Sequence, residues 1–443
     1  MKQQYDSYKP SGIDCIGDIP SHWEVFTLKQ ASTSIRNGYV GPTKDILVED
    51  GIPYIQSLHI KDGRIIFSRG WYYVSPEWGL KHPKIFTNDI VIVQTGDIGQ
   101  VALVPEEFNE CNCHALIIVV CDNRKAYPAY LCYYLRSSIG KELMLLTKTG
   151  ATLPHLNSGS ICNTQIVLPP LAEQEAIAAW LDEKCGEIDA AIAKVDREIE
   201  LIDELKQSEI SRVVTRGLNP DAPLRPSGID WIDNIPLNWS SMKLKHTVKD
   251  IETDFMDGDW IESADISTEG IRYLTSGNIG PGYYKEQGEG FISEETFEEL
   301  NCIEVFQGDL LISRLNEPIA RTCFIPDLGY RIVTCVDNVI YRPIGNLLDK
   351  RYIMYQLNCK PFWFNASQLS SGATMKRISR SKLGAIKVLV PPLLEQQAIA
   401  DYLDKKCAEI DGLKAKLSKK HETLTELRQS IISEVVTGKR KVI

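Results

Sequence analysis

The sequence predicts an α/β (α+β) protein in which two α/β domains alternate with two long helices. The helices are expected to pair as an antiparallel coiled coil, which gives a pseudo-two-fold cyclic repeat. Three observations predict this fold. One motif occurs twice, heptad-spaced apolar residues follow each copy, and the segments between the copies mix short β-type runs with helical stretches. A length of 443 residues fits such a multidomain plan.

The repeat is visible in two matches. The motif PPLxEQxAIA begins at Pro169 and again at Pro391, an offset of 222 residues, and the similarity continues to a Val-Val-Thr tripeptide after each copy. A weaker match, with an offset of 216 residues, relates two copies of PSGID that begin at Pro10 and Pro226. Both ends of the chain therefore map to one point of the repeat. We expect Met1 and Ile443 to lie near each other.

These matches divide the chain into variable and conserved parts. The predicted order is an N-terminal segment that packs near the C-terminus (1–19), a first variable domain (20–166), a first long helix (167–216), a linker (217–235), a second variable domain (236–388), and a second long helix with the tail (389–443).

The first conserved segment predicts a helix longer than a domain core needs. No proline occurs from Glu173 to about Arg216, and the Pro-Pro pair sets the start. Some 40 residues of helix would span ~60 Å. Its apolar positions alternate spacings of four and three, as in a coiled coil, and they are Leu181, Cys185, Ile188, Ile192, Val195, Ile199 and Ile202.

The second copy retains much of this seam, with Leu403, Cys407, Ile410, Leu417 and Leu424. Lys414 and His421 occupy two further seam positions, and Leu413 and Leu427 are expected to replace them in part. Residues 167–216 carry a net charge of −6 and residues 389–443 a net charge of +2, which favours pairing of the two helices. The cyclic repeat favours an antiparallel pair, with one variable domain at each end of a rod.

The variable domains are near neutral, although the chain carries a net charge of −10. Strands are predicted at 90–93, 116–120 and 310–312, and helices at 129–135 and 350–357. Polar loop side chains occupy matched places in the two domains and differ in chemistry. They are Gln56, Ser57, His59, Gln94, Thr95 and His155 in the first domain, and Thr275, Ser276, Asn278, Arg314, Asn316, Lys376 and Arg377 in the second.

The segment LPPLxEQxAIAxxLD follows a TGAT or SGAT loop and an NDI or GDL strand start. In these motifs the whole chain resembles the specificity subunit of Type I restriction-modification systems. The resemblance implies two target-recognition domains, each reading one half of a bipartite site in double-stranded DNA. The polar loop side chains given above are then the candidate DNA-binding residues, because bases are read by side-chain donors and acceptors. The resemblance also implies helices that fix the gap and dock two methyltransferase subunits, which restriction or translocase subunits then join. The residues expected at docking or coiled-coil positions are Glu173, Gln174, Glu395, Gln396 and the seam positions above.

The resemblance implies a cytoplasmic, non-catalytic chain without cofactors, with S-adenosylmethionine, ATP and Mg²⁺ bound by partner subunits. The sequence has no GxGxxG or Walker A motif, and leucine follows each Pro-Pro pair instead of the aromatic residue of an amino-methyltransferase loop. No run of apolar residues is long enough to cross a membrane, and the 12 cysteines lack zinc-site spacing. Two alternatives stay open at this point: a coiled-coil scaffold that does not read DNA, and a fused methyltransferase or nuclease recognition protein.

Overall fold

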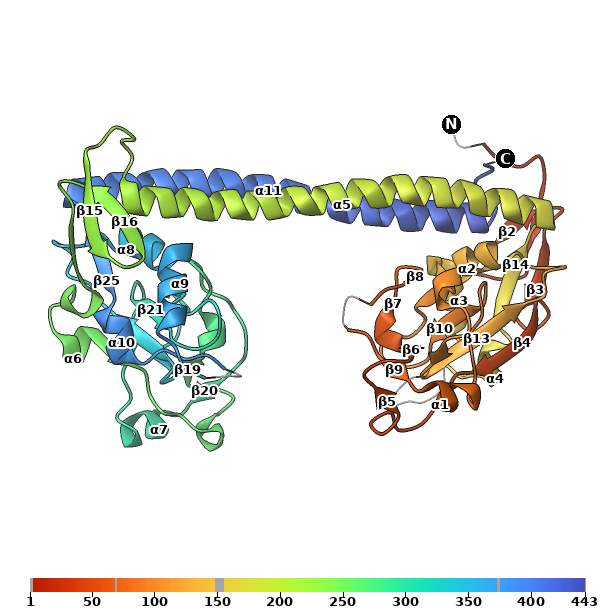
Figure 1. Ribbon diagram of the computed structural model, residues 1–443, viewed down its shortest axis with the longest axis horizontal. Coiled ribbons are helices and arrows are strands. Elements are labelled where there is room, and N and C mark those ends of the chain that lie inside the picture. The colour runs from red at the N-terminus through yellow and green to blue at the C-terminus, as the bar shows by residue number, and fades with distance from the viewer. Residues whose placement is uncertain (1–2, 68–69, 148–154, 373–374, 443) are drawn as a thin grey trace. The chain divides into compact units, whose positions relative to one another are not determined.

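The computed structural model describes residues 3–67, 70–147, 155–372 and 375–442. The chain divides into two units. Unit 1 comprises Met1–Asp196 and Ser418–Ile443, and unit 2 comprises Arg197–Leu417. The two long helices, α5 (Leu171–Arg216) and α11 (Leu393–Val436), each contribute one part to unit 1 and the other part to unit 2. Unit 1 is therefore built from two stretches that are distant in the sequence, whereas unit 2 is one continuous stretch, as a cyclic repeat cut once requires (Figure 1).

Unit 1 has a central antiparallel sheet in the order β11-β10-β13-β4. Its strands are β4 (Ser32–Asn37), β10 (Ile90–Val93), β11 (Val101–Leu103) and β13 (Leu116–Cys121). The four residues of β10 are all buried because the sheet lies between two cores. Ile90 and Ile92 pack in the core beneath the helices, whereas Val91 and Val93 pack in the core on the opposite face. This two-sided burial explains why the strand is continuously apolar.

Helices α2 (Pro128–Arg136) and α3 (Ser138–Leu145) lie between this sheet and the long-helix part of the unit (Figure 1). Strands β3 (Glu24–Thr27) and β14 (Gln165–Leu168) pair where the domain begins and ends. The remaining elements of unit 1 are β1 (Tyr8–Pro10), β2 (Asp18–Pro20), β5 (Leu47–Val48), β6 (Ile52–Ile55), β7 (Ile60–Lys61), β8 (Arg64–Ile65), β9 (Tyr73–Val74), β12 (Asn112–Cys113), α1 (Pro76–Leu80), α4 (Ser158–Ile161) and two 3-10 turns (Ser57–His59, Glu106–Phe108).

Unit 2 repeats this plan. Its central antiparallel sheet has the order β22-β21-β24-β18, the counterpart of β11-β10-β13-β4. The strands are β18 (Phe255–Asp257), β21 (Leu310–Ser313), β22 (Thr322–Phe324) and β24 (Asn338–Tyr341). The register is also repeated, since Ser313 faces Asn338 as Val93 faces Leu116. The predicted strands and helices of both variable domains are confirmed.

The other elements of unit 2 follow the same order. They are β15 (Leu224–Ile229), β16 (Ile232–Pro236), β17 (Ser240–Lys243), β19 (Ile271–Leu274), β20 (Phe291–Ile292), β23 (Ile332–Thr334), β25 (Lys387–Val390), α6 (Ile251–Asp254), α7 (Glu294–Glu299), α8 (Lys350–Leu357), α9 (Lys360–Gln368), α10 (Arg380–Ala385) and three 3-10 turns (Leu244–His246, Ser263–Asp265, Ser276–Asn278). Strands β17 and β25 pair as β3 and β14 do.

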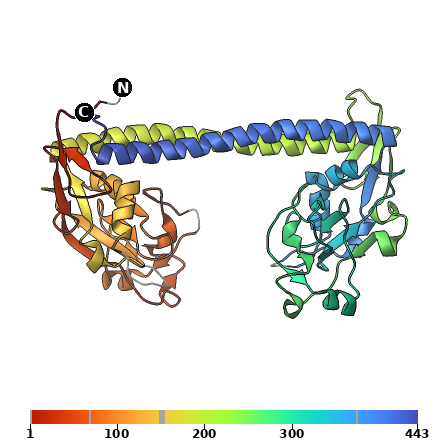
Figure 2. The ribbon, with the colours of Figure 1, turned by 180° about the vertical axis from the view of Figure 1, so that it is seen from behind.

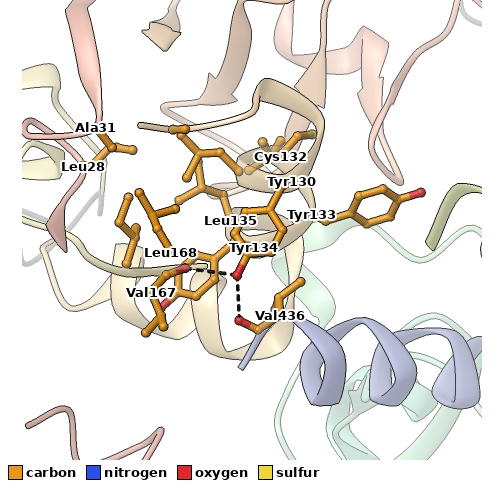
Figure 3. Packing of buried hydrophobic residues seen from close by; sticks show 14 of the residues in the cluster. Leu28, Ala31, Tyr130, Cys132, Tyr133, Tyr134, Leu135, Val167, Leu168 and Val436 are labelled. Atoms are coloured by element: carbon orange, nitrogen blue, oxygen red, sulfur yellow. Dashed lines mark hydrogen bonds between the residues drawn. The ribbon is translucent and has the colours of Figure 1, made fainter. Parts of the chain in front are cut away.

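A buried tyrosine ties each domain to the end of a long helix. In unit 1 the Tyr130 hydroxyl lies 3.1 Å from the carbonyl oxygens of Val167 and Val436 (Figure 3). In unit 2 the Tyr352 hydroxyl donates to the carbonyl oxygen of Val214 at 3.3 Å. Val436 ends α11 and Val214 lies near the end of α5, so each unit receives the end of a different long helix.

We predict that Tyr130→Phe and Tyr352→Phe each lower the free energy of unfolding by about 1 kcal/mol or slightly more, because a buried carbonyl loses its donor. Chemical denaturation followed by circular dichroism measures the change. Tyr127→Phe, at a partly exposed ring in the same unit as Tyr130, is the control and should leave stability within about 0.5 kcal/mol of wild type. Equal stability of the two buried-site variants and the control would contradict the anchoring role.

The long-helix parts pair antiparallel within each unit. In unit 1, a carboxylate oxygen of Asp189 lies 2.6 Å from the Arg428 guanidinium, and one of Asp196 lies 3.5 Å from the His421 imidazole. A later residue of α5 therefore contacts an earlier residue of α11, as in an antiparallel pair. In unit 2, the Lys414 ammonium lies 2.7 Å from a carboxylate oxygen of Asp203. An acid of α5 faces a basic residue of α11 in these three pairs, the arrangement that the net charges predict, whereas Lys206 of α5 and Asp411 of α11, 2.7 Å apart, pair with the opposite polarity.

The seam is more polar than the heptad pattern alone suggests. Its buried positions are Leu181, Cys185, Val195, Leu403, Cys407 and Ile410, and its partly buried positions are Ile188, Ile192, Ile199, Ile202, Leu417 and Leu424. The prediction that Leu413 and Leu427 replace the two polar seam residues is wrong, since these leucines are 53% and 45% exposed. Lys414 and His421 stay at the seam because acids of α5 face them.

The segments that carry the two chain ends lie side by side in unit 1 (Figure 1; Figure 2). The backbone NH of Lys441 donates to the carbonyl oxygen of Gln3 at 2.9 Å. Met1 and Ile443 themselves lie outside the described residues, so their proximity stays a prediction. Across the described ranges, no helix combines the length and the apolar character that crossing a membrane would need.

Candidate nucleic-acid interface

Beyond the end of β21, residues 314–316 form backbone hydrogen bonds with residues 376–378, which are distant in the sequence, and the two segments form a loop pair. The NH of Asn316 donates to the carbonyl oxygen of Lys376, and the NH of Ile378 donates to that of Arg314, each at 3.0 Å. The structure therefore brings four of the predicted DNA-binding residues of the second domain together: Arg314, Asn316, Lys376 and Arg377. Asn316, Lys376 and Arg377 are exposed, whereas Arg314 is buried.

Unit 1 forms the same loop pair with different side chains. The NH of Leu156 donates to the carbonyl oxygen of Gln94 at 3.0 Å, which is the counterpart of the bond between Ile378 and Arg314. Thr95 and His155 are exposed next to it. One backbone arrangement thus presents a hydroxyl and an imidazole in unit 1 where unit 2 presents amide and basic side chains.

The side chain of Arg314 is used inside unit 2. Its terminal nitrogens donate to the carbonyl oxygens of Ile378 (3.2 Å) and Val336, and they lie 3.1 Å from a carboxylate oxygen of Asp257 on β18. Burial lowers the pKa of Arg314, and the Asp257 carboxylate opposes that effect. We interpret this arginine as a group that joins the two loops to the sheet.

Gln94 occupies the corresponding place in unit 1. It is buried, and its side-chain NH₂ donates to the Asn37 side-chain oxygen at 2.8 Å. Asn37 ends β4 as Asp257 ends β18. A neutral amide pair in unit 1 therefore replaces the ion pair of unit 2, and both Gln94 and Arg314 are buried.

The second group of candidates forms a 3-10 turn in each unit. In unit 1 the NH of Gln56 donates to His59 Nδ1 at 3.0 Å, and in unit 2 the NH of Thr275 donates to Asn278 Oδ1 at 2.9 Å. His59 and Asn278 are buried, and burial lowers the pKa of His59. These two side chains shape the turn. Gln56, Ser57 and Ser276 are partly exposed and Thr275 is exposed.

Arg321 joins the two loop groups of unit 2, and sequence reasoning missed it. Its guanidinium donates to the carbonyl oxygen of Ser276 (2.7 Å) in one loop and to those of Leu315 (2.8 Å) and Asn316 (2.9 Å) in the other. The available signal is an arginine directly after the apolar pair Ile319-Ala320, at the start of β22. A buried arginine that donates to several carbonyls fixes loop positions.

An aromatic cluster in unit 1 was also missed. Trp71 stacks on Phe67 with ring centroids 4.1 Å apart, and Trp78 stacks on His82 at 3.7 Å. Trp71 is 53% exposed. The sequence signal is the Trp-Tyr-Tyr run at 71–73 followed by Trp78. Flat exposed rings of this kind suit stacking contacts with bases.

The glutamate and glutamine of each PPLxEQ motif hold the start of a long helix. Gln174 is buried, and its side chain accepts from the NH of Tyr127 (2.8 Å) and donates to the carbonyl oxygen of Lys125 (2.8 Å). Gln396 makes the matching bonds with Asp349 (2.9 Å) and Leu347 (3.0 Å). Both amides therefore serve the fold of their own unit.

The glutamates of the two PPLxEQ motifs, Glu173 and Glu395, also make hydrogen bonds within their own units. The Glu173 carboxylate accepts from the Trp23 indole NH at 3.1 Å and from the Tyr5 hydroxyl at 2.8 Å. That bond and burial raise the pKa of Tyr5 well above its ordinary value. Glu395 accepts from the Trp239 indole at 3.0 Å. The expected docking role of the PPLxEQ residues stays a prediction, with their side chains already engaged within the chain.

The loop residues Gly150, Ala151 and Thr152, and the pair at 373–374, lie outside the described residues. Within the described ranges, no group of three or more His, Cys, Asp or Glu side chains is placed to hold a metal ion. Cys113, from the one closely spaced cysteine pair, is buried, and burial raises its pKa to about 12.

Comparisons with known proteins agree with the duplicated plan. The family described as Type I restriction modification DNA specificity domain matches residues 20–200 and 245–420. The MjaVIII specificity subunit of Methanocaldococcus jannaschii is 25% identical over 434 residues, which cover 96% of this chain and 94% of the relative. The EcoKI specificity subunit of Escherichia coli K12 is 22% identical over 440 residues, covering 95% and 90%.

The fold also has a solved counterpart. A chain solved in work on complex assembly and conformational transition of the type I R-M system is 20% identical, and the match covers 94% of this chain and 98% of that one. Its TM-score of 0.69 shows a shared fold. With a family match over both variable domains and part of each long helix, this chain belongs to the Type I restriction modification DNA specificity domain family.

Proposed function

We propose that this chain is the DNA sequence-recognition subunit of a Type I restriction-modification complex. Each unit reads one half of a bipartite site in double-stranded DNA, and the paired helices set the gap between the halves. The single observation that carries this proposal is the loop pair beyond β10 and β21. One backbone bond, from Leu156 to Gln94 or from Ile378 to Arg314, joins the two loops in both units, while the exposed side chains beside it differ: Thr95 and His155 in one, Asn316 and Arg377 in the other.

A duplicated scaffold with unlike loops is what reading two different half-sites requires, because base identity is read by side-chain donors and acceptors. A scaffold that only bridged proteins would have no need for this difference. The comparisons lend no support to a fused methyltransferase or nuclease, since the relatives above are named as specificity subunits.

We further propose that the chain docks two methyltransferase subunits, one for each unit. Leu205 on α5 and Leu427 on α11 are equivalent positions of the repeat, and they are 56% and 45% exposed. Leu201 and Leu413 are also exposed, but neither has an exposed apolar equivalent in the repeat. Because a leucine exposed at both copies of one repeat position gives each unit the same apolar contact, two copies of one partner are expected. Restriction or translocase subunits then join this core.

Catalysis in this proposal belongs to the partners. The methyltransferase subunits bind S-adenosylmethionine, and the translocase subunits bind ATP and Mg²⁺. The present chain contributes target choice and spacing. The absence from its sequence of a GxGxxG or Walker A motif supports this division of labour.

The function is tested by expressing the chain with its methyltransferase partner in a host without other methylation and mapping methylated adenines by single-molecule sequencing. We expect one bipartite motif with a gap of fixed length. A contiguous motif, or no methylation from a stable complex, would contradict the proposal. Methylation by the chain alone would show that it is itself an enzyme.

The number of methyltransferase subunits bound by one chain can also be tested. Leu205→Glu or Leu427→Glu is expected to reduce the complex from two methyltransferase subunits to one, and the double variant to none, because a buried carboxylate opposes docking. Native mass spectrometry counts the subunits. Leu201→Glu, at a leucine 46% exposed whose counterpart in the repeat is Thr423, is the matched control and should keep both. Loss of both partners from one single variant would contradict independent docking.

A further inference from the structure

Arg377 differs from the other cations of its loop pair in how its guanidinium is used. Lys376 is paired with Glu317 at 3.0 Å, and Arg314 is buried. Arg377 is 43% exposed, and its Nε lies 2.8 Å from a carboxylate oxygen of Asp337. The contact is an ion pair without hydrogen-bond geometry, because Asp337 Oδ1 has no hydrogen-bond donor within the described ranges. The two terminal nitrogens of Arg377 likewise make no hydrogen bond to a described residue, so the outer edge of the guanidinium remains available.

Asp337 is an additional residue of unit 2. In unit 1 the adjacent residues Ala115 and Leu116 both make backbone hydrogen bonds, of 2.9 and 2.8 Å, to the segment that follows β4. In unit 2 the same bonds, each 2.9 Å, are made by Val336 and Asn338, and Asp337 lies between them. This one-residue insertion has no counterpart in the first domain.

The inserted residue is fixed on both sides. Its carbonyl oxygen accepts from the backbone NH of Arg314 at 2.8 Å, and its carboxylate lies against Arg377. The residue that corresponds to Arg377 in unit 1 is His155, next to which no such acid is inserted. The carboxylate and the arginine therefore occur together in one domain and are both missing from the other.

A guanidinium can bind either a phosphate or a guanine, whose O6 and N7 accept two parallel hydrogen bonds. An adjacent carboxylate weakens the attraction of an arginine for an anion, because it offsets the positive charge. The same carboxylate holds the guanidinium in place by charge, which limits the positions that the donor fork can adopt toward a neutral base edge. Phosphates are also the same in both half-sites, whereas Arg377 and His155 differ, as base-reading residues must.

We propose that Arg377 reads a guanine in the half-site bound by unit 2 and that Asp337 is its positioning residue. The inference rests on the proposed function. It adds a base identity at one position of the site and a role for the inserted acid. The half-site bound by unit 1 carries no matching arginine contact at the equivalent place.

The test compares methylation motifs of complexes that carry wild-type chain, Arg377→Gln, Arg377→Lys or Asp337→Asn. Wild type is expected to require guanine at one position that both Arg377 variants no longer require. The preference should fall roughly 10- to 100-fold, as expected for loss of a bidentate base contact. Asp337→Asn should weaken the preference at that same position only. Arg380→Gln is the matched control, since Arg380 is also 43% exposed and lies near a carboxylate, and its motif should equal wild type.

A second measurement uses the wild-type complex. Binding is measured to duplexes in which 7-deazaguanine, which lacks N7, replaces each guanine of the recognised half-site in turn. At one position, 7-deazaguanine should weaken binding of the duplex by the wild-type complex. At that same position it should cause no loss of affinity in the Arg377→Gln complex.

The possible outcomes distinguish failure of the guanine contact of Arg377 from failure of the proposed function of the chain. An unchanged motif with uniformly reduced methylation in the Arg377 variants would identify a phosphate contact and overturn the guanine assignment, leaving the proposed function intact. A wild-type complex without a bipartite motif would overturn the proposed function itself. Relaxation at several positions in both half-sites would show that Arg377 acts through the fold.

Discussion

Replacing residues 20–166 with the corresponding domain of a relative is expected to change one half of the methylated motif completely. The other half and the gap should stay as in wild type. The physical reason lies in how the domain joins the rest of unit 1. Its entry strand β3 and its exit strand β14 are hydrogen-bonded neighbours, with Glu24 opposite Leu168. A foreign domain with the same two strands therefore meets the long helix without moving it.

Single-molecule sequencing of the host genome measures the result. The reciprocal exchange of residues 236–388, whose entry and exit strands β17 and β25 pair in the same way, is the control and should change only the other half. A gap of altered length after either exchange would mean that the domains, and not the helices, set the spacing. A change in both halves would contradict independent reading.

The second large effect is on stability. Arg314→Ala is expected to lower the free energy of unfolding of unit 2 by about 3 kcal/mol, because it breaks a largely buried ion pair and leaves Asp257 with the more distant Arg380, at 3.6 Å. Asp257 would lose its nearest cation, and the carbonyl oxygens of Val336 and Ile378 would lose a donor. Hydrogen exchange should show opening at 310–316 and 376–380.

Lys376→Gln removes an exposed charge from the same loop pair and serves as the control, with an expected change within about 0.5 kcal/mol. An Arg314→Ala chain as stable as wild type but defective in DNA binding would show that this arginine contacts DNA directly.

The pH dependence of the Arg314→Ala defect follows from Asp257. Burial raises the pKa of Asp257 above its ordinary value of 3.8, while the nearby arginines lower it. A carboxyl group with a raised pKa in the folded state binds protons more tightly there than in the unfolded chain. Its ionisation therefore costs stability as the pH rises through that pKa. Without Arg314 the pKa rises further, so the stability difference between variant and wild type should narrow as the pH is lowered from 7 toward that pKa.

The repeat, the two long helices and the strands of the central sheets were predictable because each rests on local or periodic information. A PPLxEQ start with a proline-free heptad run specifies a long paired helix wherever it occurs. The opposite net charges of the two long-helix segments also predicted that the helices pair, and the ion pair of Asp189 with Arg428 confirms this.

The general plan could therefore be predicted without coordinates: two copies of one α/β domain, two paired helices, and loops at matched places whose chemistry differs. Which loop side chains stay exposed depends instead on tertiary contacts. Arg314 and Arg377 look alike in sequence, yet one is buried against β18 and the other is exposed and held by Asp337, 40 positions earlier in the chain. Burial and pairing depend on which distant segments meet, and a one-residue insertion in the turn before β24 is enough to change them.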